Sequence, residues 1–143
     1  MKAEPFVIER TYDAPVELVW KALTEKDQIK QWSFAFSDFK PEVGFEFSFI
    51  GGKDGTFIHL SKVVEVIPHK KLSYTWRYKG YVGDSVVTFE LFAEGDKTRI
   101  KLTHEGIEEL AVNGPDFSKE NFVIGWTTII GTNLKDFVEK MTS

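Results

Sequence analysis

Alternating apolar and polar side chains over the middle of the chain predict a sheet. In the clearest case, Phe45, Phe47 and Phe49 alternate with Glu46 and Ser48. Successive side chains of a strand point to opposite faces, so this spacing predicts one apolar face and one solvated face. Short turns between such stretches favour antiparallel pairing of neighbours. Strands are predicted at residues 6–12, 56–67, 72–78, 87–91 and 100–104, with extended chain from residue 34 onward and a turn at 51–55.

Helical spacing replaces this alternation near the N-terminus. Pro15 suits the first turn of a helix, and the apolar residues after it recur on one face as far as about Thr24. Residues 27–32 predict a second short helix. Two short helices are therefore expected between the first two strands.

A long amphipathic helix is predicted at the end of the chain. Ser118 is a suitable N-cap, and a helix from there to about Thr142 would be roughly 35 Å long. Asn133 is expected to interrupt its apolar face near the centre, and Gly125 and Gly131 suggest close approach of a neighbouring backbone. The apolar face comprises Phe122, Val123, Trp126, Ile129, Ile130, Leu134, Phe137 and Met141.

This order of elements predicts an α+β fold in which a curved antiparallel sheet packs against its last helix. A chain of 143 residues suits one domain, here residues 1–143, and can bury roughly 68–70% of its unfolded surface. Such a sheet can enclose a pocket beneath the helix.

Charge and composition restrict the partners and the compartment. The net charge is -4 and the longest basic run is Lys70-Lys71, so nucleic acid is not an expected partner. The absence of cysteine excludes disulfides and thiolate chemistry and fits a reducing compartment. No apolar stretch suits a signal peptide or a membrane span, so we expect a cytoplasmic protein.

No residue cluster in the sequence specifies a reaction. His59, His69 and His104 lie on different predicted elements, without the spacing of a metal site. The glycines at 51–52 lack the spacing of a phosphate-binding loop, and no pair of acidic residues suggests acid–base catalysis. We therefore assign no catalytic residue, no metal and no cofactor.

Several short motifs, in this order and spacing, resemble the SRPBCC (START-like) superfamily, in particular bacterial relatives of the C-terminal domain of the heat-shock-protein ATPase activator. The resemblance covers nearly the whole chain. The motifs are Ala14-Pro15 with Val19-Trp20, then Trp32, Leu72-Ser73-Tyr74-Thr75-Trp76, Val87-Thr88-Phe89, Leu102-Thr103-His104-Glu105-Gly106 and Gly125-Trp126.

The resemblance implies a helix-grip fold, in which about seven antiparallel strands wrap the C-terminal helix and leave a cavity. This chain departs from the family at Pro41-Glu42-Val43-Gly44, where Pro-Gly-Gly is common. The activator also has a separate N-terminal domain for which this chain has no room, so co-chaperone activity is not implied.

The implied cavity has nine candidate lining residues. Any single aromatic among them is better explained as core, and His104 as a core histidine with one satisfied nitrogen. Asn133 would need a hydrogen-bond partner, since a buried unpartnered amide costs about 1–3 kcal/mol. The candidates are Phe47, Tyr74, Trp76, Phe89, His104, Trp126, Ile130, Asn133 and Phe137.

The leading hypothesis is a protein that binds a small, largely apolar or aromatic molecule. An empty apolar hole of about 300 Å³ would cost on the order of 7 kcal/mol, so the cavity is expected to be small or occupied. Two alternatives stay open: an enzyme of the cyclase, aromatase or hydrolase type, in which His104, Asn133 and Tyr74 orient the substrate, and a protein-interaction or stress-related module. The sequence also leaves open a homodimer.

Overall fold

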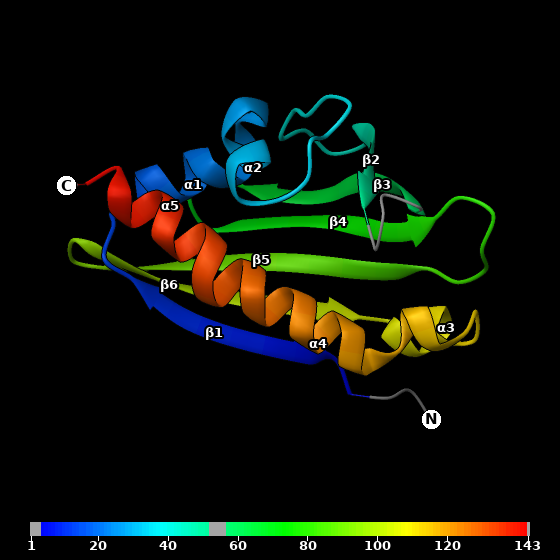
Figure 1. The fold of residues 1–143 in the computed structure, drawn as a ribbon. Coiled ribbons are helices and arrows are strands. Elements are labelled where there is room, and N and C mark those ends of the chain that lie inside the picture. The colour runs from blue at the N-terminus through cyan, green and yellow to red at the C-terminus, as the bar shows by residue number, and fades with distance from the viewer. Residues whose placement is uncertain (1–3, 52–56, 143) are drawn as a thin grey trace.

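One antiparallel sheet of six strands forms the centre of the molecule (Figure 1). The computed structural model describes residues 4–51 and 57–142. The strand order is β1-β6-β5-β4-β3-β2, so β1 and β2 form the two edges. The strands are β1 (Phe6–Tyr12), β2 (Glu46–Gly51), β3 (Phe57–Ile67), β4 (Lys71–Tyr78), β5 (Ser85–Glu94) and β6 (Lys97–Glu105).

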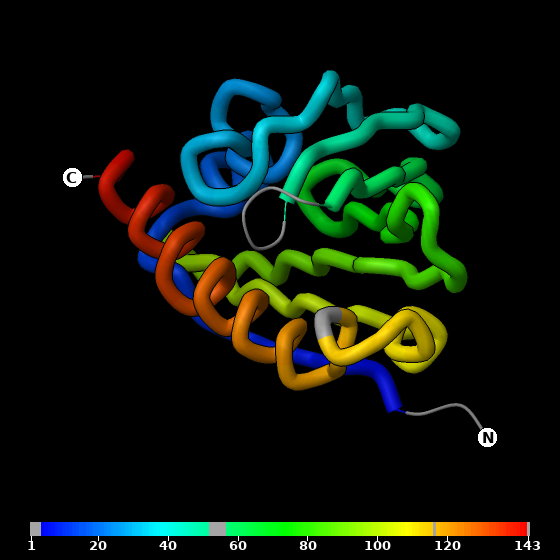
Figure 2. The backbone as a smooth tube through the Cα atoms, turned by 45° about the vertical axis from the view of Figure 1, so that its right-hand side comes forward, coloured from blue at the N-terminus to red at the C-terminus, as the bar shows by residue number. Residues whose placement is uncertain are grey.

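The helices lie on one face of this sheet, and the C-terminal helical run crosses it diagonally (Figures 1 and 2). This arrangement confirms the predicted α+β fold of the helix-grip kind, with two short helices between the first two strands. The helices are α1 (Val16–Thr24), α2 (Lys26–Trp32), α3 (Ile107–Ala111), a short 3-10 turn η2 (Pro115–Phe117), α4 (Lys119–Thr128), the π-helical segment η3 (Ile129–Asn133) and α5 (Leu134–Lys140). None of these helices is long and apolar enough to cross a membrane.

The segment between α2 and β2 differs from the extended chain expected there. Residues 33–45 contain no strand, and Phe36 and Phe39 are both buried against the sheet. Its aromatic side chains turn inward together, and the backbone N–H of Ser37 donates to the carbonyl of Ser48 at 2.8 Å, so this segment runs beside the edge strand β2 without being a strand itself (Figure 2). The described residues therefore form six strands where about seven were expected. The predicted turn at 51–55 and the first residue of the strand predicted at 56–67 lie largely outside the described residues.

The C-terminal helical run contains a π-helical segment that the sequence did not predict. The backbone N–H of Leu134 donates to the carbonyl of Ile129, an i→i+5 bond in place of the α-helical i→i+4 bond. The hydroxyl of the fully buried Tyr12 donates to the carbonyl of Ile130, 2.5 Å away. A side chain from β1 thus binds the backbone at this wider turn.

The wider turn changes which residues face the sheet. Buried residues recur every four positions along the run. In a regular α-helix, residues four apart differ in direction by about 40° around the helix axis, so such a series would gradually turn away from the sheet. The π-helical segment takes up part of this rotation. As a result Asn133 is exposed, so its expected position on the apolar face is wrong. The buried positions are Phe122, Trp126, Ile130, Leu134 and Val138.

The end of the last helix is attached to the junction between β1 and α1. The backbone N–H of Asp13 donates to Glu139 Oε2 at 2.9 Å, and Lys135 Nζ donates to Glu139 Oε1 at 2.8 Å. These bonds lower the pKa of Glu139. On the next residue, the carbonyl of Ala14 accepts a hydrogen bond from the buried Thr98 Oγ1. This corner therefore joins α5, β1 and β6.

The helical glycines are not explained by close backbone packing, contrary to expectation. A Cβ added at Gly125 would meet no atom within 4 Å, and one at Gly131 would meet only the side chain of Arg10, at 3.6 Å. Both positions are therefore open to a larger side chain.

Gly125→Ala is expected to raise the free energy of unfolding by about 0.5–1 kcal/mol, because alanine has the higher helix propensity and its methyl group meets open space. Urea denaturation measures this change. Gly106→Ala is the contrasting variant: its φ is +88° and a Cβ would lie 2.8 Å from the carbonyl oxygen of Asp84, so it should destabilise. Equal destabilisation by both variants would contradict the open packing at Gly125.

Candidate functional site

Seven of the nine candidate residues are buried together on the concave face of the sheet, in a group that we call the aromatic cluster. Its centre is Trp126, whose ring lies 5.3 Å from that of Trp76 and 6.1 Å from that of Phe89. Tyr74 continues the cluster toward β2, with its ring 5.2 Å from that of Phe47. Its members are Phe47, Tyr74, Trp76, Phe89, His104, Trp126 and Ile130.

The other two candidates lie apart from this buried cluster. Phe137 is partly buried and packs against the core. Asn133 is exposed, so it supplies no polar group to the concave face of the sheet. The sequence predicted that Asn133 would interrupt the apolar face of the last helix. In the structure the π-helical segment turns Asn133 outward, so this face is not interrupted there.

A chain of hydrogen bonds joins α4 to the sheet within the cluster. Trp126 Nε1 donates to His104 Nδ1 at 3.0 Å. His104 Nε2 lies 2.9 Å from Ser85 Oγ, which donates to the carbonyl of Trp76 at 2.6 Å. Every polar group in this chain has a partner, although all four residues are buried. The network therefore stabilises the contact between helix and sheet.

His104 and Ser85 lie at the distance expected for a histidine base and a serine nucleophile. The direction of the hydrogen bond between them, however, does not fit that role. Because the indole N–H of Trp126 donates to Nδ1, that nitrogen is the acceptor and Nε2 carries the proton. His104 therefore donates to Ser85 and cannot take its proton. Burial also lowers the pKa of His104 to about 3, which keeps the ring neutral. This geometry opposes the role of His104 as a general base.

A second aromatic region lies on the same face, across strands β2, β3 and β4. Cross-strand pairing places His59 between Phe49 and Tyr78. The imidazole stacks on Phe49 with ring centroids 4.3 Å apart and an interplanar angle of 14°. Two residues further along β3, Ser61 pairs with Phe47. Both polar side chains are buried among aromatic rings.

Phenylalanines of the segment 33–45 cover this region. Phe34 lies over Phe49 and His59, with centroid distances of 5.0 and 5.6 Å. Phe36 stacks on Phe47 and Phe49, at 4.7 and 4.9 Å. Phe36 is buried whereas Phe34 is partly exposed. The cover is thus made of side chains from a segment without helix or strand.

Two polar atoms in this enclosure, Nδ1 of His59 and Oγ of Ser61, have no hydrogen-bond partner among the described residues. Leaving a buried polar group unpartnered costs about 1–3 kcal/mol. Burial lowers the pKa of His59 to about 4, and the backbone carbonyls of Phe49 and Phe57 oppose that shift only in part. The ring is therefore neutral near pH 7. We refer to His59 and Ser61 as the polar pair.

The sequence did not single out the polar pair as a site. Both faces of β3 carry apolar residues, with Ile58 and Leu60 on one phase and Val63 on the other, so alternation did not show which phase is buried. The useful signal was the position of Ser61 opposite the phenylalanine at 47, which only the pairing register reveals.

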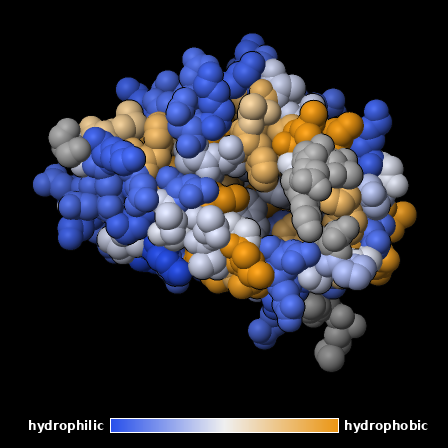
Figure 3. Space-filling model, in the orientation of Figure 1, coloured by the Kyte–Doolittle hydropathy of each residue, from blue (hydrophilic) through white to orange (hydrophobic). Residues whose placement is uncertain are grey.

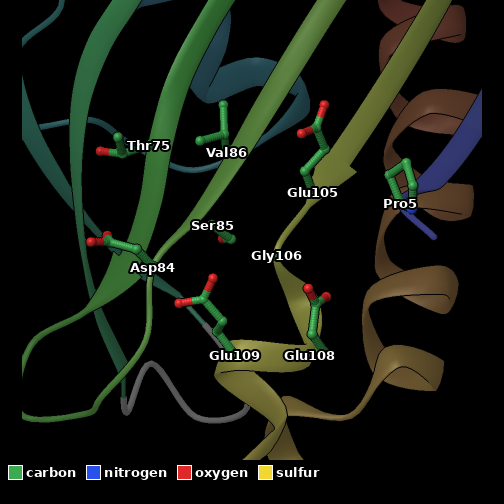
Figure 4. Close-up of a pocket in the computed structure, with 9 residues that line it drawn as sticks. All are labelled: Pro5, Thr75, Asp84, Ser85, Val86, Glu105, Gly106, Glu108 and Glu109. Atoms are coloured by element: carbon green, nitrogen blue, oxygen red, sulfur yellow. The ribbon is translucent and has the colours of Figure 1, made fainter. Parts of the chain in front are cut away.

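An acidic groove of about 480 Å³ lies on the opposite face of the sheet (Figure 4). Thr75, Val86 and Glu105 pair across β4, β5 and β6 and alternate with the inward-facing residues. Glu108 and Glu109 extend toward the groove from α3. No group of acidic residues and histidines within the described residues suits a metal ion. This groove is separate from the predicted cavity.

The space-filling view shows a hollow in the concave face, beside the last helix and partly edged by apolar residues (Figure 3). Near α3, aromatic rings form a series of contacts that runs from the surface of the protein to its interior. Tyr81 is 43% exposed, and its ring lies 5.7 Å from that of Phe57, which in turn is 5.9 Å from that of Tyr78. Tyr78 then lies 4.5 Å from His59. The contacts continue from His59 to Trp76, at 5.0 Å, and so to Trp126.

Comparison with solved structures shows the same fold in several bacterial proteins. The protein MLL2253 from Mesorhizobium loti is 28% identical, with a TM-score of 0.72 and coverage of 96% of each chain. CalU16 from Micromonospora echinospora is 25% identical, with a TM-score of 0.72, over 96% of this chain and 78% of its own.

A third structure is DynU16, described as a putative protein in the dynemicin biosynthetic locus. It is 20% identical with a TM-score of 0.79, and the match covers 96% of this chain but 48% of DynU16, so the chain spans about half of that protein. None of the curated proteins compared with the chain matches it. The family described as activator of Hsp90 ATPase homolog 1-like protein matches residues 13–139, and the chain therefore belongs to this family of the SRPBCC superfamily.

Proposed function

We propose that the protein binds a small, largely apolar or aromatic molecule on the concave face of the sheet. The observation that carries this proposal is the continuous series of ring contacts from the exposed Tyr81 to the buried Trp126. Aromatic side chains offer large, rigid apolar surfaces, and binding sites for small molecules are lined mainly by such groups. The series also reaches the surface, at the exposed ring of Tyr81.

An enzyme using the same face has less support. That alternative depended on His104, Asn133 and Tyr74 orienting a substrate. The first donates its proton to Ser85 and accepts from Trp126, and the second is exposed. Binding therefore explains this face better than catalysis does.

We expect naphthalene, a neutral apolar probe, to shift the indole N–H resonances of Trp76 and Trp126 in ¹⁵N-resolved NMR spectra. The indole of Trp32 is an internal reference, because it donates to the carbonyl of Ala22 away from the series. Phe57→Ala should weaken naphthalene binding at least fivefold. Native mass spectrometry of the purified protein would also show whether a small molecule is retained.

The matched control is Phe92→Ala. Phe92 lies on the solvated face of β5, where it contacts the guanidinium of Arg99 at 4.2 Å. This variant should bind naphthalene as the wild type does. Resonance shifts confined to residues around Phe92, or an equal loss of affinity in both variants, would refute the proposed location.

A further inference from the structure

The polar pair identifies the chemistry that a ligand would need on the concave face. His59 Nδ1 and Ser61 Oγ are buried, lie on the same face of β3 and have no partner within residues 4–51 and 57–142. The α-carbons of residues two apart on a strand are separated by roughly 6–7 Å and their side chains lie on one face, so one small molecule can contact both side chains. The next residue on this face, Val63, is apolar and fully buried. An apolar residue is therefore tolerated on this strand face, and packing alone does not require two polar ones.

We propose that His59 and Ser61 hydrogen-bond an uncharged polar group on an aromatic ligand, with Phe34 moving aside to admit it. This inference rests on the proposed function, since it assumes that the concave face binds a small molecule. To the proposed function it adds which residues recognise the ligand and which kind of chemical group on the ligand they recognise. The aromatic body of the ligand would replace Phe34 against the stacked rings of Phe49 and His59.

The surroundings of the polar pair favour a neutral group. Its ring neighbours are Phe34, Phe49, Trp76 and Tyr78, none of which carries a charge near pH 7. Burial raises the pKa of Tyr78 to about 12 and lowers that of His59 to about 4, so both remain neutral. None of these described neighbours would supply a cation to compensate a buried carboxylate. A phenol, by contrast, offers one donor and one acceptor.

Phe34 is the residue whose movement would expose the polar pair. Its ring covers His59 at 5.6 Å, and it is only partly buried. A Cβ added at Gly51 would lie 2.7 Å from the ring of Phe34 and 3.0 Å from that of His59. Both rings therefore lie close to the end of β2, where only glycine leaves them room.

Three naphthalene derivatives test the proposal, with affinities measured by NMR titration. The wild type should bind 2-naphthol about tenfold more tightly than naphthalene, and 2-naphthoate more weakly than either. Ser61→Ala and His59→Phe should each remove most of the preference for 2-naphthol and leave the affinity for naphthalene within twofold. Ser61→Ala removes only one hydroxyl, so it provides the test if His59→Phe does not fold.

Ser73→Ala is the matched control. Ser73 is also a buried serine, on the neighbouring strand, but its hydroxyl already pairs with that of Thr88 at 3.0 Å. This variant should keep the preference for 2-naphthol. Equal wild-type affinity for naphthalene and 2-naphthol, or a preference that persists in Ser61→Ala and His59→Phe, would overturn the role of the polar pair. Failure of all three compounds to bind would instead overturn the proposed function.

Discussion

Trp126→Ala is expected to lower the free energy of unfolding by about 3–5 kcal/mol, measured by urea denaturation. The substitution removes a buried ring that contacts Trp76 and Phe89, and a large-to-small change of this kind leaves a cavity. It also leaves Nδ1 of His104 without its donor. Domains of this size are commonly stable by about 5–15 kcal/mol, so the variant should be close to unfolding.

Two further variants separate the contributions of the ring and its N–H. Trp126→Phe keeps an aromatic ring but removes the donor, and should cost about 1–3 kcal/mol. Ile124→Ala changes a residue of the same helix that is 66% exposed, and should alter stability by less than about 0.5 kcal/mol. If Trp126→Ala were no more destabilising than Ile124→Ala, the helix would not be held to the sheet at this point.

Mild acid is expected to destabilise the protein steeply. Burial lowers the pKa of His104 to about 3 and that of His59 to about 4, whereas an unfolded histidine titrates near 6.5. At a pH between the folded and unfolded pKa values, these two histidines bind protons in the unfolded chain but stay neutral in the folded protein. Stability is therefore fully present above about pH 6.5 and is lost as the pH falls. The slope from each histidine should approach about 1.4 kcal/mol per pH unit as the pH falls well below 6.5.

The slope can be assigned by measuring urea denaturation between pH 7 and pH 5. His59→Phe removes one of the two groups and should reduce the slope by about half. Glu139 does not interfere, because its pKa lies below the usual value of 4.5 and its contribution is lost only at lower pH. A free energy of unfolding that stays constant from pH 7 to pH 5 would show that the two imidazoles do not remain neutral in the folded protein.

Most of the fold could be predicted from the periodicity of the sequence. Alternation located the strands closely, as at Leu72, Tyr74 and Trp76, because one face of the sheet is buried under helices and the other is solvated. The segment 33–45 was the exception. Its aromatic residues resemble a strand in spacing, but they contact the sheet as a cover, a tertiary arrangement that no local pattern encodes.

The candidate site was predicted in part. The aromatic cluster forms as expected around Trp126, since these residues fall on the apolar phases of their elements. Asn133 was misplaced because the prediction used a constant rotation of 100° per residue, which the π-helical segment breaks. The unpartnered state of His59 and Ser61 depends on which atoms surround them, so only three-dimensional contacts could reveal it.

The π-helical segment, which Tyr12 contacts at Ile130, separates two further attachments of the last helix. Trp126 holds α4 through His104, and Glu139 holds α5 through the backbone of Asp13. The segment between them departs from α-helical hydrogen bonding, so we expect any bending of the run to occur there. We expect α4 to tilt when a molecule enters the concave face, while the corner that joins α5 to β1 stays in place. The last helix would then move as two segments and not as one rigid body.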